Sequence, residues 1–223
     1  MINIKIKSLS GKPIDSIIFD LGGVLLNLDF KRSIDAFISL GFNNVEKELS
    51  RLLFSQPAGN NLSFFHLYET GRISSGEFRD ELRKHAGLNT PDKDIDEAWT
   101  AMLMDLHGEN LEIMKKIKGS FRIFLLSNTN PIHIESLHSR NDTGIIYSVL
   151  EGLCEKVYYS HEVGMRKPDR EIFDHVISDS GLDPEKTLFI DDSIPNIEAA
   201  DNAGLHAYHH KAGASLREVF NIT

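Results

Sequence analysis

The stretch Ile17–Asp29, IIFDLGGVLLNLD, decides the fold of this chain. An apolar run of the kind that forms a buried strand ends on one carboxylate, Asp20, and the chain then breaks at Gly22 and Gly23 before apolar residues resume. A charge at the end of a buried strand is costly unless something uses it. A metal ion, a catalytic role or a tight turn would each explain Asp20, and the rest of the sequence must decide among them.

Apolar, β-branched runs like the first recur between helical patterns. They cover residues 16–20, 122–128, 156–160, 186–192 and 205–210. Because these runs are apolar throughout, they predict strands buried on both faces, and therefore a parallel sheet covered by helices. We expect a doubly wound α/β fold. The amino-terminal INIKIK alternates in polarity and predicts either an extra edge strand or a frayed tail.

About a hundred residues separate the first two of these runs, far more than one crossover needs. The segment 30–107 reads as helical throughout, with a capping-box pattern at 74–77 and a last helix over 91–106. The sequence therefore predicts an α/β core, residues 1–29 and 108–223, with an inserted helical cap domain.

Composition limits the partners and the compartment. The net charge of −9 argues against nucleic acid or an anionic membrane as the main partner. No apolar run approaches a membrane span, and the first residues lack the apolar block of a signal peptide. The single cysteine, Cys154, excludes an internal disulfide and suits a reducing compartment. We expect a cytoplasmic protein, monomeric or weakly dimeric, that acts on a small molecule.

Polar residues stand at the carboxyl ends of the predicted strands, the edge where open parallel sheets bind ligands. In chain order they are Asp20, Ser127, Asn128, Lys167, Asp191 and Asp192. Three converging carboxylates would repel one another unless a hard divalent cation such as Mg²⁺ lay among them. A hydroxyl, an amide and a lysine can all donate to phosphoryl oxygens. The set therefore fits a site for a metal ion and a phosphate.

Each feature also has a purely structural explanation. Asp191 and Asp192 could cap the following helix, residues 127–130 could be turn residues, and Lys167 could be a solvated loop lysine. The pair Gly22–Gly23 lacks the third glycine of a dinucleotide site. The occurrence of all of them in order, at strand ends, favours a functional site.

Four segments carry a family resemblance: FDLGGVL (19–25), LSNTN (126–130), GMRKPDREIF (164–173) and FIDDSIPNIEAA (189–200). They resemble the four ordered motifs of the haloacid dehalogenase-like (HAD) hydrolase superfamily, and the helical insertion resembles its cap domain. The likeness is greatest to bacterial sugar-phosphate phosphatases of the glucose-1-phosphate phosphatase type, whose first motif also reads Asp-Leu-Gly.

This resemblance implies roles in phosphoryl transfer. Asp20 would be the nucleophile and form an aspartyl-phosphate. Ser127, with Asn128, would hold the transferring phosphoryl group. Lys167 would neutralise the phosphoryl charge and help to keep Asp20 ionised.

The resemblance also implies a Mg²⁺ site. Asp20, Asp192 and the backbone carbonyl of Gly22 would be ligands, and Asp191 would lie either in contact with the metal or one shell further out. Asn196 stands where many relatives have another acid, and we expect it to orient its neighbours through hydrogen bonds.

One departure from the family pattern concerns the general acid. Most phosphatases of the superfamily carry a second Asp two residues after the nucleophile, and here that residue is Gly22. We expect a Mg²⁺-dependent phosphatase acting on a small phosphate ester. The alternative is a phosphate-binding or regulatory protein with impaired turnover. The missing acid weighs against a phosphomutase, and the retained Asp191 and Asp192 weigh against a dehalogenase.

Overall fold

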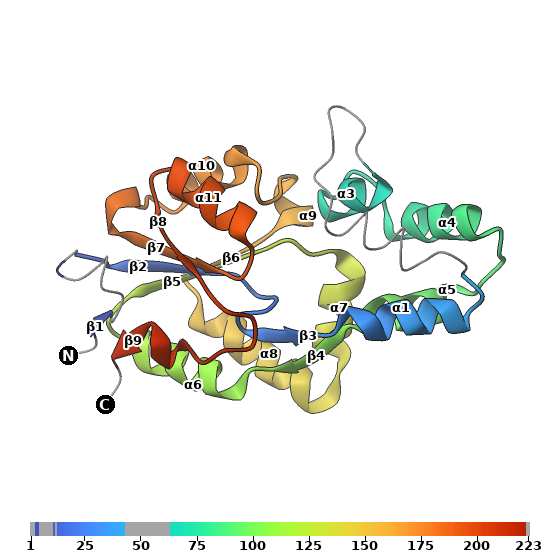
Figure 1. Ribbon diagram of the computed structural model, residues 1–223, viewed down its shortest axis with the longest axis horizontal. Helices are drawn as coiled ribbons and strands as arrows, with labels where there is room; N and C mark the ends of the chain where they lie inside the picture. Colours follow the sequence, from blue (N-terminus) through green and yellow to red (C-terminus); the bar gives the residue numbers. More distant parts are fainter. Residues whose placement is uncertain (1–2, 5–10, 12, 43–62, 222–223) are drawn as a thin grey trace.

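The computed structural model describes residues 3–4, 11, 13–42 and 63–221, and its centre is a five-stranded parallel sheet (Figure 1). The strand order is β6–β5–β2–β7–β8, and each neighbouring pair runs parallel. The five predicted runs are these strands, which confirms the doubly wound core. They are β2 (Ser16–Phe19), β5 (Arg122–Ser127), β6 (Lys156–Tyr159), β7 (Thr187–Asp191) and β8 (His206–His209).

Side chains of the central strands alternate between two hydrophobic cores, one on each face of the sheet. Ile17 and Phe19 of β2 belong to one core, whereas Ile18 between them belongs to the other, and all three are fully buried. The apolar residues of β5 and β7 alternate in the same way. Burial on both faces explains why the interiors of these runs lack polar residues.

Helices cover both faces of the sheet (Figure 1). On one face lie α6 (Gly108–Ile117) and α8 (Asn141–Leu153), and on the other α10 (Arg170–Asp179) and α11 (Ile194–Asn202). The chain leaves β2 toward β5 and β6 and later returns to β7 on its other side. The carboxyl ends of β2 and β7 therefore meet where the strand order reverses. Shorter connecting elements are α7 (Pro131–Ser139), α9 (Ser160–Val163), η2 (Pro184–Lys186) and η3 (Leu216–Glu218).

The described helices of the insertion lie beyond the carboxyl ends of the strands, at the right of Figure 1. They are α1 (Phe30–Ser39), α3 (Phe64–Glu69), α4 (Ser75–Ala86) and α5 (Asp92–Thr100). Phe65, Phe78 and Trp99 contact one another at the centre of this bundle. The capping box is confirmed, because Ser74 and Glu77 each accept a hydrogen bond from the other's backbone N–H. Residues 43–62 of the predicted bundle lie outside the described residues.

The prediction that 30–107 is helical throughout is wrong near its end. β4 (Leu103–Leu106) pairs antiparallel with β3 (Leu26–Leu28), and the Asp29 N–H donates to the Met102 carbonyl at 2.9 Å. The two linkers of the insertion thus form one ribbon. Leu103 and Leu106 stand at helical spacing, and the pairing partner lies across the whole insertion, so local periodicity could not reveal the strand.

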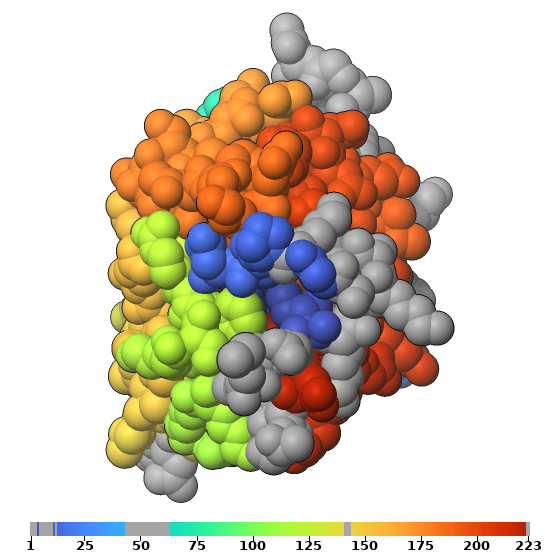
Figure 2. All heavy atoms as spheres, turned by 90° about the vertical axis from the view of Figure 1, so that its left-hand side faces the viewer, coloured from blue at the N-terminus to red at the C-terminus, as the bar shows by residue number. Residues whose placement is uncertain are grey.

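The described ends of the chain lie together on the opposite side of the molecule. β1 (Asn3–Ile4) pairs antiparallel with β9 (Phe220–Asn221), and Figure 2 shows the blue start of the chain beside its red end. This pair is a separate small sheet, so β1 is not an edge strand of the main sheet; most of INIKIK lies outside the described residues. Among the described residues, no helix has the length and apolar character needed to cross a bilayer.

Candidate active site

Lys167 joins the ends of three strands. Its Nζ donates to Asp20 Oδ1 at 2.7 Å, to Asp191 Oδ2 at 2.7 Å and to the Leu126 carbonyl at 2.9 Å. These acceptors follow or end β2, β7 and β5. The side chain is 1% exposed, and its three N–H groups match its three acceptors. The sequence reasoning placed these residues at one edge of the sheet, and the structure brings them into contact.

Burial and neighbouring charges set the protonation of this pair. Burial alone lowers the pKa of Lys167, but the charges of Asp191 and Asp20 raise that pKa above its ordinary value. Burial raises the pKa of Asp20 to about 7, opposed by Lys167 and reinforced by the charges of Asp191 and Asp192. A cation bound beside Asp20 would lower its pKa again and favour the carboxylate, which is the nucleophilic form.

Three carboxylates form a cluster whose chemistry fits a divalent cation. Asp20, Asp191 and Asp192 each offer an oxygen, and these oxygens lie within 4.8 Å of one another. Lys167 supplies one positive charge against three negative ones, so a divalent ion would balance the remainder. The donor set consists of oxygens alone, as Mg²⁺ prefers.

Asp191 and Asp192 differ in how free their oxygens are. Asp191 is fully buried and accepts from the Ser193 N–H at 2.8 Å, from Asn196 Nδ2 at 3.0 Å and from Lys167. Asp192 is partly exposed. The carboxylate of Asp192 is therefore more open to a further ligand than that of Asp191, whose oxygens are already engaged by the protein. The expected hydrogen bonds of Asn196 to a neighbouring carboxylate are present, and its orienting role stays a prediction.

The two glycines after Asp20 have different reasons to be glycine. Gly23 has φ +74°, and a Cβ there would collide with Asp192 Oδ2. Gly22 has no positive φ, and a Cβ there would lie 2.7 Å from Leu28 Cδ1, the end of a flexible side chain. The sequence analysis gave a role to Gly22 but none to Gly23. Nothing in the local sequence shows that the Cα of Gly23 faces the carboxylate of Asp192, which is far away in the chain.

Ser127 and Asn128 have different surroundings. Ser127 lines the cavity next to the cluster, and its hydroxyl makes no hydrogen bond to any described residue. Asn128 donates from Nδ2 to the Lys167 carbonyl at 2.8 Å and accepts at Oδ1 from the Lys167 N–H at 2.9 Å. Asn128 thus clamps the loop that carries Lys167. Its predicted contact with phosphate stays a prediction.

A cavity of about 380 Å³ lies between the sheet and the insertion. Gly22, Ser127 and Lys167 line it, and Lys167 contacts two carboxylates of the cluster, although none of the three carboxylates is itself a lining residue. Its opposite wall is mostly apolar and comes from the insertion and its linkers: Leu28, Phe30, Trp99, Met102 and Leu103. Such a volume suits a small molecule.

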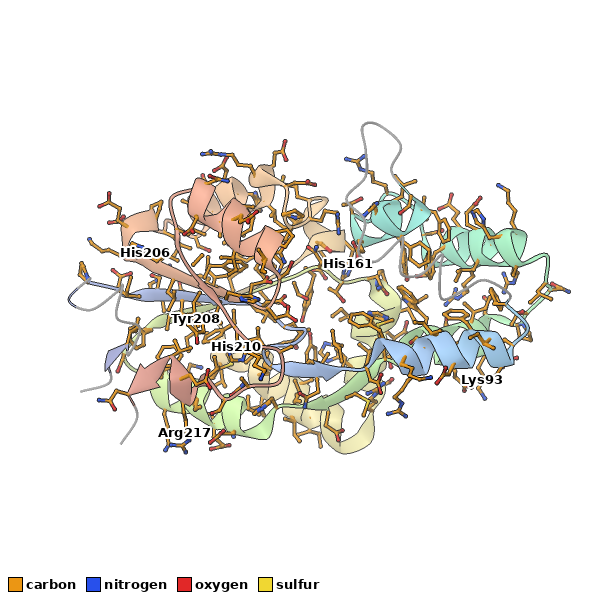
Figure 3. All side chains as sticks on the ribbon, viewed as in Figure 1. Lys93, His161, His206, Tyr208, His210 and Arg217 are labelled. Carbon is orange, nitrogen blue, oxygen red and sulfur yellow. The ribbon has the colours of Figure 1, made fainter. Side chains whose placement is uncertain are left out.

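Contacts close to this cavity hold the insertion against the core. A Cβ at Gly71, just after α3, would collide with the His161 carbonyl of α9, so the two backbones touch; Figure 3 shows His161 beside α3. Trp99 Nε1 donates to Asn130 Oδ1 at 3.4 Å, and the His133 ring stacks on Trp99. The insertion is thus packed in place over the cavity.

Fold and site together define an α/β enzyme with a carboxylate–lysine centre beneath an inserted helical bundle. The family model of the haloacid dehalogenase-like hydrolases matches residues 14–204. The chain belongs to this family of hydrolases, as the four motifs predicted.

Several individual proteins are similar over nearly the whole chain. D-ribitol-5-phosphate phosphatase of Bacteroides thetaiotaomicron is 30% identical over 209 residues, which are 94% of this chain and 98% of that one. A HAD-family enzyme of the same organism, solved with magnesium and inorganic phosphate, is 36% identical with a TM-score of 0.75 and covers 91% of this chain and 96% of its own. A predicted HAD-like hydrolase of Porphyromonas gingivalis is 33% identical with a TM-score of 0.80, covering 92% and 94%.

Proposed function

We propose that this chain is a Mg²⁺-dependent phosphatase that hydrolyses the phosphate ester of a small sugar or polyol through a phosphorylated Asp20. The observation that carries the proposal is the 2.7 Å contact of Asp20 with buried Lys167 beside the cavity. The activity named for the ribitol-phosphate relative supports the substrate class. The magnesium and phosphate held by the related structure support the cofactor and the ligand.

In the proposed reaction, a carboxylate oxygen of Asp20 attacks phosphorus, the bond from phosphorus to the ester oxygen breaks, and the departing alkoxide takes up a proton from water to become the alcohol. Water then attacks the phosphorus of the aspartyl-phosphate, which restores Asp20 and releases inorganic phosphate. Lys167 and Ser127 stabilise the phosphoryl oxygens. Asp20, Asp192 and the Gly22 carbonyl would hold the Mg²⁺, which supplies positive charge at the phosphoryl group.

We assign the insertion, residues 30–107, as the cap of this active site. Its apolar wall excludes water from the cavity, and its linkers join it to the core at one ribbon. Exclusion of water strengthens the electrostatic contacts inside the site. The shape of the closed cavity then decides which leaving group can bind.

Release of inorganic phosphate from sugar phosphates, polyol phosphates, nucleotides and an aryl phosphate tests the proposal. We expect turnover with Mg²⁺, none in excess chelator, and recovery when Mg²⁺ is restored. We expect Ca²⁺ to inhibit, because it imposes a larger and looser coordination. Binding of phosphate without release from any ester would instead favour the non-catalytic alternative.

A further inference from the structure

An ion pair between the cap and the core forms part of the cavity wall. Arg166, in the loop that carries Lys167, donates from Nε to Oε2 of Glu69 on α3 at 3.0 Å. Both residues line the cavity, and their side chains are 14% and 22% exposed. Glu69 is the only carboxylate among the described residues that line this cavity.

The pair leaves hydrogen-bonding groups unused. Oε1 of Glu69 and both terminal nitrogens of Arg166 make no hydrogen bond to the described residues, and neither residue has a side-chain atom that is both fully buried and unpaired. By contrast, Arg79 and Asp96 inside the cap form a two-bond fork at 2.8 Å and 2.8 Å. A purely structural ion pair would be expected to use its fork in the same way.

These free groups suit neighbouring hydroxyls. Oε1 can accept from one hydroxyl, and a terminal nitrogen of Arg166 can donate to the next, whereas the apolar cap residues around them offer neither. A few placed polar groups in an apolar wall fix the orientation of a small ligand. Because Arg166 directly precedes Lys167, hydroxyls bound here would be positioned relative to the phosphoryl site.

We propose that Glu69 and Arg166 together recognise vicinal hydroxyls of the leaving group, and so select phosphorylated polyols and sugars over simple alkyl phosphates. This inference rests on the proposed phosphatase function. A site built to hydrogen-bond a hydroxyl discriminates strongly against an analogue without it, because its own buried polar groups are left unpaired. We therefore expect a discrimination of about a hundredfold or more.

The test compares a five-carbon polyol 5-phosphate with pentyl phosphate, which has the same chain length and ester but no hydroxyls. For the wild type we expect a kcat/KM ratio of about 100 or more in favour of the polyol. Glu69→Gln and Arg166→Lys should each lower that ratio by about 10- to 100-fold, with a larger effect on KM than on kcat. Asp96→Asn, which breaks the cap's own ion pair, should leave the ratio unchanged.

Other outcomes would overturn the inference in distinguishable ways. An unchanged ratio in both Glu69→Gln and Arg166→Lys would remove the pair from substrate recognition. Equal losses on polyol and pentyl phosphate, with p-nitrophenyl phosphate spared, would make Glu69 a proton donor to poor leaving groups. A fallen ratio in Asp96→Asn would point to general loosening of the cap. If the wild type releases phosphate from none of the esters, the proposed phosphatase function is wrong. That result is distinct from a failure of hydroxyl recognition by Glu69 and Arg166.

Discussion

The core and the cap face the same cavity with different chemistry. On the core side, Lys167 has three hydrogen bonds and Asp191 is held by Ser193, Asn196 and Lys167, so these two charged groups are each fixed by several partners. Among the described cap residues that line the cavity, all except Glu69 are apolar, and Glu69 has one bond to Arg166. The contrast teaches that the charged groups of the core are held in place at strand ends by several bonds, whereas the polar group that the described part of the cap offers to the cavity is held by one.

The largest loss of activity is expected at Asp20, on the core side of the cavity. Asp20→Asn keeps the shape of the side chain, but an amide cannot attack phosphorus as a carboxylate does. We expect phosphate release to fall by about a thousandfold or more, with the thermal midpoint little changed. Asp35→Asn, on the exposed face of α1, is the control and should retain wild-type activity. More than a tenth of the activity left in Asp20→Asn would contradict the assignment of the nucleophile.

The next effect is expected at Gly22, two residues after Asp20. General acid catalysis contributes roughly a hundred- to ten-thousandfold, most for poor leaving groups. With glycine here, we expect aryl and anomeric sugar phosphates to be cleaved much faster than primary alkyl phosphates. Gly22→Asp should improve the worst substrates most, because its backbone tolerates a side chain once Leu28 shifts. Rates that do not vary with leaving-group pKa would show that another acid protonates the alcohol.

A smaller effect is expected on the metal. Gly23→Ala would push a Cβ into the carboxylate of Asp192, the proposed ligand, and a change in the groups that surround a metal's ligands typically costs about 10- to 100-fold in metal affinity. The Mg²⁺ concentration needed for half-maximal activity should rise accordingly. Gly181→Ala is the matched control, since Gly181 also has positive φ but a Cβ added there would meet no atom within 4 Å. An equal rise in both variants would mean that backbone strain, and not Asp192, is responsible.

The smallest effect concerns the junction of cap and core at His133. Burial lowers the pKa of His133 to about 4, so the folded protein keeps this ring neutral while the unfolded chain takes up a proton below about pH 6.5. Unfolding is thereby favoured as the pH falls through this window. The free energy of unfolding should fall by about 1 kcal/mol between pH 7 and pH 5.5 because of His133. His133→Gln should flatten this slope, as measured by urea unfolding, and an unchanged slope would contradict the assignment to His133.

The sequence predicted the core better than the cap because strand ends carry their signal locally. Continuous apolar runs gave all five strands, and the polar residue closing each run gave the contacts of Lys167 with Asp20 and Asp191. Three features depend on residues far apart in the chain. They are strand β4, the close approach of Gly23 to Asp192, and the ion pair of Glu69 with Arg166. The spacing of leucines at 103–106 predicted a helix instead of β4, and nothing in the local sequence distinguished Glu69 from any other helical glutamate.

The ribbon of β3 and β4 makes the enzyme modular. Because the Asp29 N–H reaches the Met102 carbonyl at 2.9 Å, the insertion enters and leaves the core at a single point. A tight hairpin turn could bridge these two residues, and closing so short a loop has a small entropic cost. The same junction would accept a different helical bundle without moving the strand ends that carry the chemistry. Exchange of the cap at this ribbon is therefore a practical route to phosphatases of new specificity with an unchanged catalytic core.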